Sequence, residues 1–350
     1  MGHHFSLRRF NQILLALLLF FGILYLGQSF IVPIAIGGLF AMLLVPVCRK
    51  LEKWRVPRTG AAVLCVLTVV VVLALVIVVL VDQITALAND LPRLDLRLAA
   101  LLDDIRHFIN DTFEVSREEQ NAYLQRSIRS SLQLVGIYLR SLFFFAGSIL
   151  VSFIIVMSYT LLFLLYRRRL KNFIMRVTAN YDANAHAIVG KITDVASSYI
   201  AGVFLVVLIL SIINTAGLAI IGIEHALLFG LMAGILNIIP YIGSLTGSLI
   251  PVLFALLTKD SLWTPLVVAI FFLVVQQIES YILTPNITGG KIKLNPMATL
   301  MVLLLGSAIW GIAGMIVFVP YLGIAKVVFD NINRLKPLGY VLGKDGDGEG

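Results

Sequence analysis

Charged side chains are scarce in this chain. Asp, Glu, Lys and Arg make up 13% of its 350 residues, whereas soluble domains carry about 25%. Hydrophobic residues reach 59%, and the mean hydropathy is +0.98. So few polar groups cannot cover the surface of a water-soluble globule. The composition therefore excludes an ordinary soluble domain and indicates an integral membrane protein that uses the lipid bilayer as its solvent.

Cysteines and the common catalytic motifs are almost absent as well. The only two cysteines, Cys48 and Cys65, both lie near one predicted membrane face, which argues against a disulfide framework and against a metal site. The sequence contains no GxxxxGK[ST] loop, HExxH, GxSxG or regularly spaced Cys/His set. We therefore expect no enzyme, no cofactor, no metal and no nucleic-acid partner, and a single-chain ATP-driven pump is disfavoured.

Long apolar runs are what the chain has instead of charge. A helix needs about 20 apolar residues to cross a hydrocarbon layer about 30 Å thick. The fold we predict is an all-α integral membrane protein with about eight transmembrane helices, over 11–27, 30–48, 59–82, 141–166, 196–223, 226–257, 262–285 and 298–328. The first run follows a short basic region without a small-residue cleavage pattern, so we expect a retained span and not a removed signal peptide.

The basic residues indicate which loops face the cytoplasm, because short cytoplasmic loops are rich in Lys and Arg. With the N-terminus inside, alternation of the loops places 18 basic residues inside and 9 outside. The two decisive loops are RKLEKWRVPR (49–58) and RRRLKNFIMR (167–176). We therefore expect both termini to lie in the cytoplasm.

One extended segment is polar enough to face water. Residues 83–140 carry apolar side chains at helical spacing, which predicts an extracytoplasmic helical insert. Its apolar stripes pack on each other, on another subunit or around a substrate vestibule, and these alternatives stay open. The predicted domains are spans one to three (1–82), the insert (83–140), spans four to eight with the transport site (141–330) and a cytoplasmic tail (331–350).

The sixth predicted span is interrupted. Pro240 has no backbone N–H and frees a carbonyl in a helix interior, and Asn237 brings an amide to membrane depth. Gly243 and Gly247 permit close backbone approach. The segment is a Pro-kinked helix, one broken helix, or two half-helices that re-enter from the same face. Freed backbone groups are tolerated in membranes only inside protein or beside a wet cavity, so we favour a break at a transport pathway, with Tyr241 beside it.

The stretch VQQIESYILTP (275–285) places a carboxylate inside another apolar run. At 100° per residue Gln276, Glu279 and Ser280 share one helical face, and Gln277 adds a second amide. An ionised carboxylate at the centre of a span costs roughly 2.5–3.5 kcal/mol. Glu279 should therefore face the protein interior, stay protonated or pair with a cation, unless it reaches the lipid headgroups. The first three options make it a candidate proton or ion site.

The segment that follows is rich in turn and small residues. Pro285 begins a shaped turn, and the neighbouring Asn286 joins the candidate pathway. The last predicted span carries small and helix-breaking residues, which predict a single kinked helix with a small face. These residues are Gly306, Gly311, Gly314 and Pro320.

Two blocks carry a resemblance to a known family: IIPYIGSLTGSLIP (238–251), and the ordered pattern of Q-x-x-E, a proline after the helix, KLNP and G-x-x-G…VP over 276–320. In these blocks and in its architecture the chain resembles the autoinducer-2 exporter (PerM-like permease) family of bacterial membrane proteins. The resemblance implies eight spans, a large extracytoplasmic insert, homo-oligomeric assembly and a place in the bacterial inner membrane. Members are linked to export of the quorum-sensing signal autoinducer-2, and some to sodium/proton exchange. Val203 and Ser280 stand where many members have an amide, which argues against a strongly polar solute.

We therefore expect a secondary transporter or exporter of a small polar solute of the autoinducer-2 kind, coupled to or gated by protons or sodium. The alternatives are a sodium/proton antiporter and a passive oligomeric channel or membrane scaffold without active transport. An intramembrane enzyme would need paired acids or a zinc set, which the spans lack. The predicted pathway residues are Asn237, Pro240, Tyr241, Gly243, Gly247, Gln276, Gln277, Glu279, Ser280 and Asn286.

Overall fold

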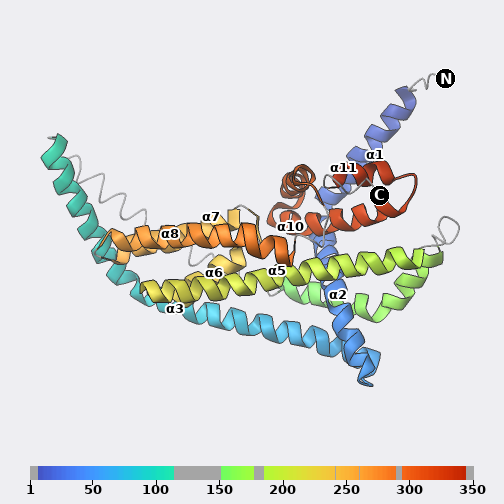
Figure 1. The fold of residues 1–350 in the computed structure, drawn as a ribbon, viewed down its shortest axis with the longest axis horizontal. Coiled ribbons are helices and arrows are strands. Elements are labelled where there is room, and N and C mark those ends of the chain that lie inside the picture. The colour runs from blue at the N-terminus through green and yellow to red at the C-terminus, as the bar shows by residue number, and fades with distance from the viewer. Residues whose placement is uncertain are drawn as a thin grey trace. The chain divides into compact units, whose positions relative to one another are not determined.

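The computed structural model of the protein describes residues 7–113, 151–176, 185–240, 242–259, 261–288 and 294–343. Over these ranges the chain is helical and contains no strand, as predicted (Figure 1). The elements are α1 (Leu7–Leu26), α2 (Gln28–Lys53), α3 (Arg58–Phe113), a helix over Val151–Arg176, α5 (Ala185–Ile221), α6 (Ala226–Leu236), α7 (Ile242–Thr258), α8 (Trp263–Ile278), the π-helix η1 (Glu279–Leu283), α9 (Thr284–Ile287), α10 (Pro296–Asn331) and α11 (Lys336–Leu342).

Many of these helices are long and apolar enough to cross a membrane. Six meet that condition by length and composition, namely Gln28–Lys53, Arg58–Asp90, Val151–Arg176, Ile188–Ile221, Trp263–Ile287 and Pro296–Asn331. Their surfaces expose large apolar side chains such as Leu208 and Leu273. Helices satisfy their backbone hydrogen bonds internally, so such a surface is stable in lipid. The all-helical, multi-pass membrane class is therefore confirmed, and the count of eight spans stays a prediction.

The chain forms two compact units, each assembled from separate segments. The first unit takes Met1–Thr68, Ser152–Phe204 and Pro285–Gly350, and the second takes Val69–Val151 and Leu205–Thr284. The second unit holds the interrupted span and Glu279, so it is the unit that matters for the site.

In the second unit the interrupted span is a hairpin of two half-helices. α6 and α7 pack side by side, because Gly243 lies against the Leu236 carbonyl and Gly247 lies against Ala233 (Figure 1). A side chain at either glycine would collide with the α6 backbone, so both positions need a residue without a Cβ. The structure therefore contains a break into two half-helices and not one continuous kinked helix, and their entry from the same membrane face stays a prediction.

The turn of this hairpin forms where the backbone cannot continue a helix. The N–H groups of Ile238 and Ile239 bond to carbonyls three residues earlier, at 3.1 and 2.9 Å. Pro240 has no N–H to donate, and the Ile242 N–H then bonds to the Pro240 carbonyl at 2.7 Å as α7 begins. The proline thus separates two helices that run in opposite directions.

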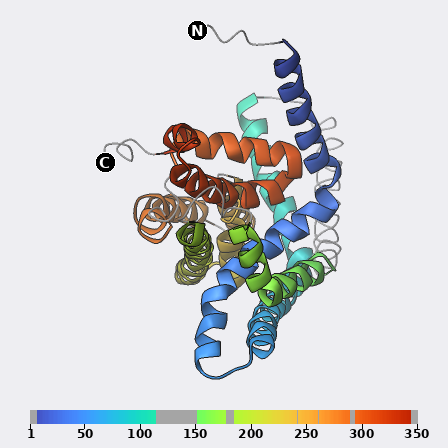
Figure 2. The same ribbon diagram turned by 90° about the vertical axis from the view of Figure 1, so that its right-hand side faces the viewer.

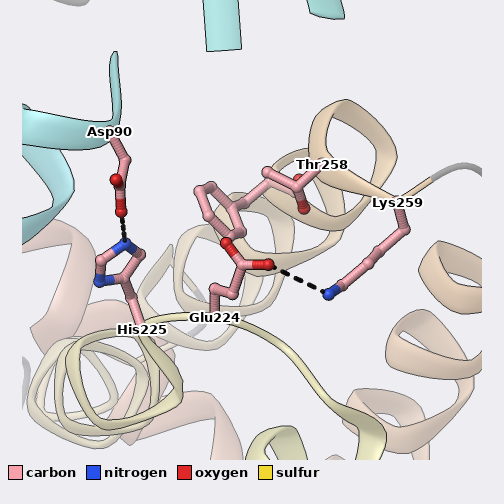
Figure 3. A network of polar contacts seen from close by, with 6 residues as sticks. Asp90, Glu224, His225, Thr258 and Lys259 are labelled. Carbon is pink, nitrogen blue, oxygen red and sulfur yellow. Dashed lines mark hydrogen bonds and ion pairs between the residues drawn. The ribbon is translucent and has the colours of Figure 1, made fainter. Parts of the chain in front are cut away.

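The two ends of the hairpin lie together and are held by charged pairs (Figure 3). Lys259 Nζ, just after α7, lies 3.4 Å from Glu224 Oε1, just before α6. His225 precedes α6 in a left-handed backbone conformation with φ of 58°, and its Nε2 lies 2.9 Å from Asp90 Oδ2 of α3. The hairpin therefore begins and ends near Asp90, the last residue of the apolar stretch Arg58–Asp90 of α3.

α6 packs on α5 through small residues on both helices. Gly230 of α6 lies against Thr215 of α5, and Gly234 of α6 lies against Ser211 of α5. The contacting residues are thus four apart on each helix. Positions four apart share one helical face, and small residues there let two backbones approach closely. The second unit also has an apolar core, which consists of Leu218, Ile223, Phe229, Ala233, Phe254, Ala255, Val268 and Phe272.

In the first unit the last predicted span is also a hairpin and not a single kinked helix. Gly311 has φ of 59° and ψ of −136°, values that do not belong to a helix. On either side of it Gly306 and Gly314 pack backbone to backbone, although eight residues separate them in the sequence. α10 therefore turns back on itself, and Figure 2 shows its two segments side by side. The prediction of one kinked helix is corrected, because a reversal needs the positive φ that glycine tolerates.

Asn295 joins the start of α10 to the end of the chain's last helix. Its Oδ1 accepts the Ala298 N–H at 2.7 Å, which caps α10. Its Nδ2 donates to the Val341 carbonyl at 2.7 Å, and its backbone N–H donates to the Leu342 carbonyl at 2.9 Å. Asn295 thus pairs with one free N–H in the first turn of α10 and with two free carbonyls at the C-terminal end of α11.

The α10 hairpin generates a stability prediction. In Gly314→Ala the new Cβ would collide with the Gly306 carbonyl, so the two segments must separate. We expect a loss of about 1–3 kcal/mol of unfolding free energy, as for overpacked sites. Gly22→Ala in α1 is the matched control, because a Cβ there meets no atom within 4 Å. Thermal unfolding in detergent would measure both, and equal midpoints for the two variants would contradict the hairpin.

Candidate functional site

The second unit contains a cavity of about 400 Å³. α5, α6, α7, α8 and η1 all contribute side chains to it. This volume lies within the range of about 300–1,000 Å³ that is typical of small-molecule sites. Its walls are formed by Leu210, Asn214, Ala233, Asn237, Ser244, Leu245, Ser248, Leu249, Val252, Ala269, Phe272, Leu273, Val275, Gln276 and Glu279.

Glu279 is the only acidic side chain among the described residues that line this cavity, and two amides hold it. Asn237 Nδ2 donates to Glu279 Oε1 at 2.7 Å, and Gln276 Nε2 donates to Glu279 Oε2 at 3.2 Å. Gln276 Nε2 also lies 3.4 Å from Ser280 Oγ. The predicted convergence of Gln276, Glu279 and Ser280 on one helical face is therefore found in the structure. Each carboxylate oxygen of Glu279 receives one N–H donor.

Two interruptions of regular helix bring this cluster together. Asn237 is the C-cap residue of α6 and lies where the helix ends and the turn of the hairpin begins. Glu279 is the first residue of η1, where the α-helix widens into a π-helix. Such π-helical turns are rare and are frequent at functional sites. The shortest bond of the cluster thus joins the hairpin turn to the widened part of the following helix.

Some of the other predicted pathway residues pack in the hairpin, and others are exposed on the surface. Gly243 and Gly247 provide the contact between the half-helices, and Pro240 shapes the turn. Gln277 is exposed and does not line the cavity. Asn286 is exposed on α9, in the first unit. Tyr241 lies outside the described residues.

Sequence reasoning missed Asn214 on α5. It is 4% exposed, and it lines the cavity that contains Glu279. The signal that could have found it is an amide in an otherwise apolar helix, on the face that carries the small residues Ser211 and Thr215. Ser244 and Ser248 of α7 line the cavity as well and were also not predicted.

The chemistry of the cavity suits a small solute better than a multivalent metal. Across the described residues there is no group of three or more His, Cys, Asp or Glu side chains that could hold a metal ion. One carboxylate, three amides and two hydroxyls stand among apolar walls. A few placed polar groups in an otherwise apolar pocket are what fixes the orientation of a small ligand.

Long apolar helices with a cavity that carries a few polar groups beside a helical hairpin resemble the architecture of membrane transport proteins with discontinuous helices. The sequence pattern of the family described as "AI-2E family transporter" matches residues 14–334. The chain therefore belongs to the AI-2E family of transporters, as its resemblance implies.

Named relatives align with nearly the whole chain. A Bacillus subtilis (strain 168) protein named "Putative transport protein YueF" is 29% identical over 352 residues, which cover 93% of this chain and 92% of that protein. The "AI-2 transport protein TqsA" of Escherichia coli (strain K12) is 23% identical over 305 residues, which cover 87% of this chain and 86% of TqsA. The chain is thus similar to transport proteins along its length.

The Glu279 cluster generates a second prediction. Asn237→Ala and Glu279→Ala each remove one side of the same hydrogen bond, so their effects on stability should not add. We expect a coupling of about 1.5–3 kcal/mol, the range for hydrogen bonds to charged groups. Unfolding of the two single variants and the double variant in detergent measures it.

The matched control is the same cycle with Gln277→Ala in place of Glu279→Ala, because Gln277 is exposed beside the cluster. That pair should be additive. A coupling near zero in the Asn237–Glu279 cycle would show that the bond does not hold the hairpin turn to η1.

Proposed function

We propose that this protein is a secondary transporter that moves a small polar solute through the cavity at Glu279. The observation that carries the proposal is the bond from Asn237 at the hairpin turn to Glu279 at the start of η1. It places a titratable group at the joint between a hairpin and a widened helix, inside a cavity large enough for a small solute. Its support is chemical, because an acid kept at membrane depth in a polar cluster is a candidate proton site.

Protonation of Glu279 would change what this joint can do. The ionised carboxylate accepts from both Asn237 and Gln276, so its two oxygens are satisfied. A protonated carboxyl turns one oxygen into a donor, and an amide N–H cannot accept a hydrogen bond. The neutral form therefore weakens the bond at the oxygen that carries the proton, until the facing amide turns to offer its own oxygen. A proton would thus bias the hairpin between two arrangements, which is the requirement for coupling transport to protons.

The candidate solute follows from the family. TqsA is named as an AI-2 transport protein, so autoinducer-2 is the first solute to test. The relatively apolar walls and the few polar groups of the cavity agree with a small solute of moderate polarity. Export through the bacterial inner membrane, with sodium as the alternative coupling ion, belongs to the same proposal.

The hairpins also suggest a sidedness for the second half of the chain. The α6–α7 hairpin returns to Asp90, where the apolar stretch Arg58–Asp90 of α3 ends and which the sequence places outside, so Lys259 belongs outside as well. The span over Trp263–Ile287 then runs inward.

The transport proposal predicts the effect of Glu279→Gln. Glutamine keeps the shape of the side chain but cannot titrate, and its amide cannot accept at both positions. We expect uptake of autoinducer-2 into inside-out vesicles to fall at least about tenfold and to lose its dependence on pH. Gln277→Ala is the control and should transport like the wild type, because Gln277 lies outside the cavity. Unchanged flux and pH dependence in Glu279→Gln would refute the role of the carboxylate.

The sidedness predicts labelling at two exposed positions. In a chain with Cys48 and Cys65 replaced by alanine, Ser261→Cys should react with a membrane-impermeant maleimide added to intact cells. Thr59→Cys, next to the 49–58 basic loop, should react only after permeabilisation. Alternation of eight spans would place residue 261 inside, so protection of Ser261→Cys in intact cells would contradict the proposed arrangement.

A further inference from the structure

Asn214 presents a buried acceptor that the protein itself does not satisfy. The side chain is 4% exposed, and within the described part of the chain no donor bonds to its Oδ1. Leaving a buried carbonyl without a donor is destabilising, and native proteins contain few such groups. An unsatisfied group of this kind therefore requires an explanation, and its position in the cavity suggests one.

The packing of α5 fixes the orientation of Asn214. On one side of the helix Ser211 and Thr215 are locked against Gly234 and Gly230 of α6. Near the end of the helix Gly217 lies directly against the ring of Phe271 of α8. α5 is thus held by two neighbours at once, so it cannot rotate to expose the amide to solvent. Because the Oδ1 atom itself is fully buried, a solute hydroxyl reaches it only when the Asn214 side chain turns toward the cavity.

The carboxylate in the cavity already has a donor at each of its two oxygens. Each oxygen of Glu279 accepts one amide N–H, from Asn237 and from Gln276. The Asn214 Oδ1 therefore has unused capacity beside apolar walls such as Leu210 and Phe272. A solute with a hydroxyl donor at one end and an apolar part would satisfy this acceptor and cover the walls.

We infer that Asn214 is a solute-binding residue, whose carbonyl oxygen accepts a hydrogen bond from a hydroxyl group of the transported molecule. The inference rests on the proposed function and adds the residue that orients the solute. The acceptor is already desolvated in the protein, so only the hydroxyl of the solute loses water when the bond forms. The cost appears as lower stability of the solute-free protein, as is common where function requires an unsatisfied group.

If Asn214 lowers stability but binds the solute, its replacement should raise the thermal midpoint and also raise KM. Asn214→Leu has nearly the same shape but removes the unsatisfied acceptor. We expect the thermal midpoint of the solute-free variant in detergent to rise by about 2 °C or more. For autoinducer-2 uptake into inside-out vesicles we expect KM to rise at least about tenfold, the loss of one hydrogen bond to the solute. Asn214→Thr keeps an acceptor oxygen and should recover part of the affinity.

Ser211→Ala is the matched control on the same helix. Ser211 is as buried as Asn214 but packs against Gly234 and does not line the cavity. This variant should leave KM unchanged whatever its effect on the midpoint. A lower midpoint with unchanged KM in Asn214→Leu would make Asn214 an ordinary packing residue, and a raised midpoint with unchanged KM would equally remove its role in binding.

Glu279→Gln in the same vesicles separates this inference from the proposed function. If Glu279→Gln abolishes uptake while Asn214→Leu keeps the wild-type KM, the transport proposal stands and the inference about Asn214 fails. If Glu279→Gln keeps uptake and its pH dependence while Asn214→Leu raises KM, the role of the carboxylate fails and Asn214 remains a solute-binding residue.

Discussion

The bond between Asn237 and Glu279 is the contact on which the site depends. A carboxylate at membrane depth is costly unless donors surround it, and the donors here come from a hairpin turn and from the preceding turn of its own helix. Both partners lie where a regular α-helix ends. Asn237 is the C-cap residue of α6, shortly before Pro240, and Glu279, to which it donates, is the first residue of the π-helix η1. The cavity is bounded by the elements that this bond connects.

Both units of the protein use the same device to reverse the chain within an apolar region. In each, a half-helix turns and packs on its predecessor through glycines that meet backbone to backbone, Gly243 on Leu236 in one unit and Gly314 on Gly306 in the other. Each second half-helix also contains a proline, Pro251 in α7 and Pro320 in α10. Dispersion between closely packed backbones is the main force that can hold such hairpins in lipid, because lipid removes the hydrophobic driving force between helices.

Much of the site could be predicted from the sequence, because a single charge and a proline in apolar runs are strong signals. Glu279, Gln276 and Asn237 were selected on those grounds, and the structure brings them together. Other features have no local signature. Gly311 looks like any helix glycine in the sequence, since only its backbone angles show that the chain reverses there. Asn214 follows no break in its helix, and its importance depends on which donors fold around it, a tertiary property that periodicity does not report.

The hydrogen bonds of Asn295 limit where another protein or a tag can be fused to the chain. The carbonyls of Val341 and Leu342 complete the hydrogen bonding of a residue that also caps α10. The last helix is therefore part of the fold of its unit and not a dispensable appendage. Any affinity tag or fluorescent fusion has to be joined beyond Gly343, since a shorter end would leave the amide of Asn295 without acceptors and loosen the first turn of the second hairpin.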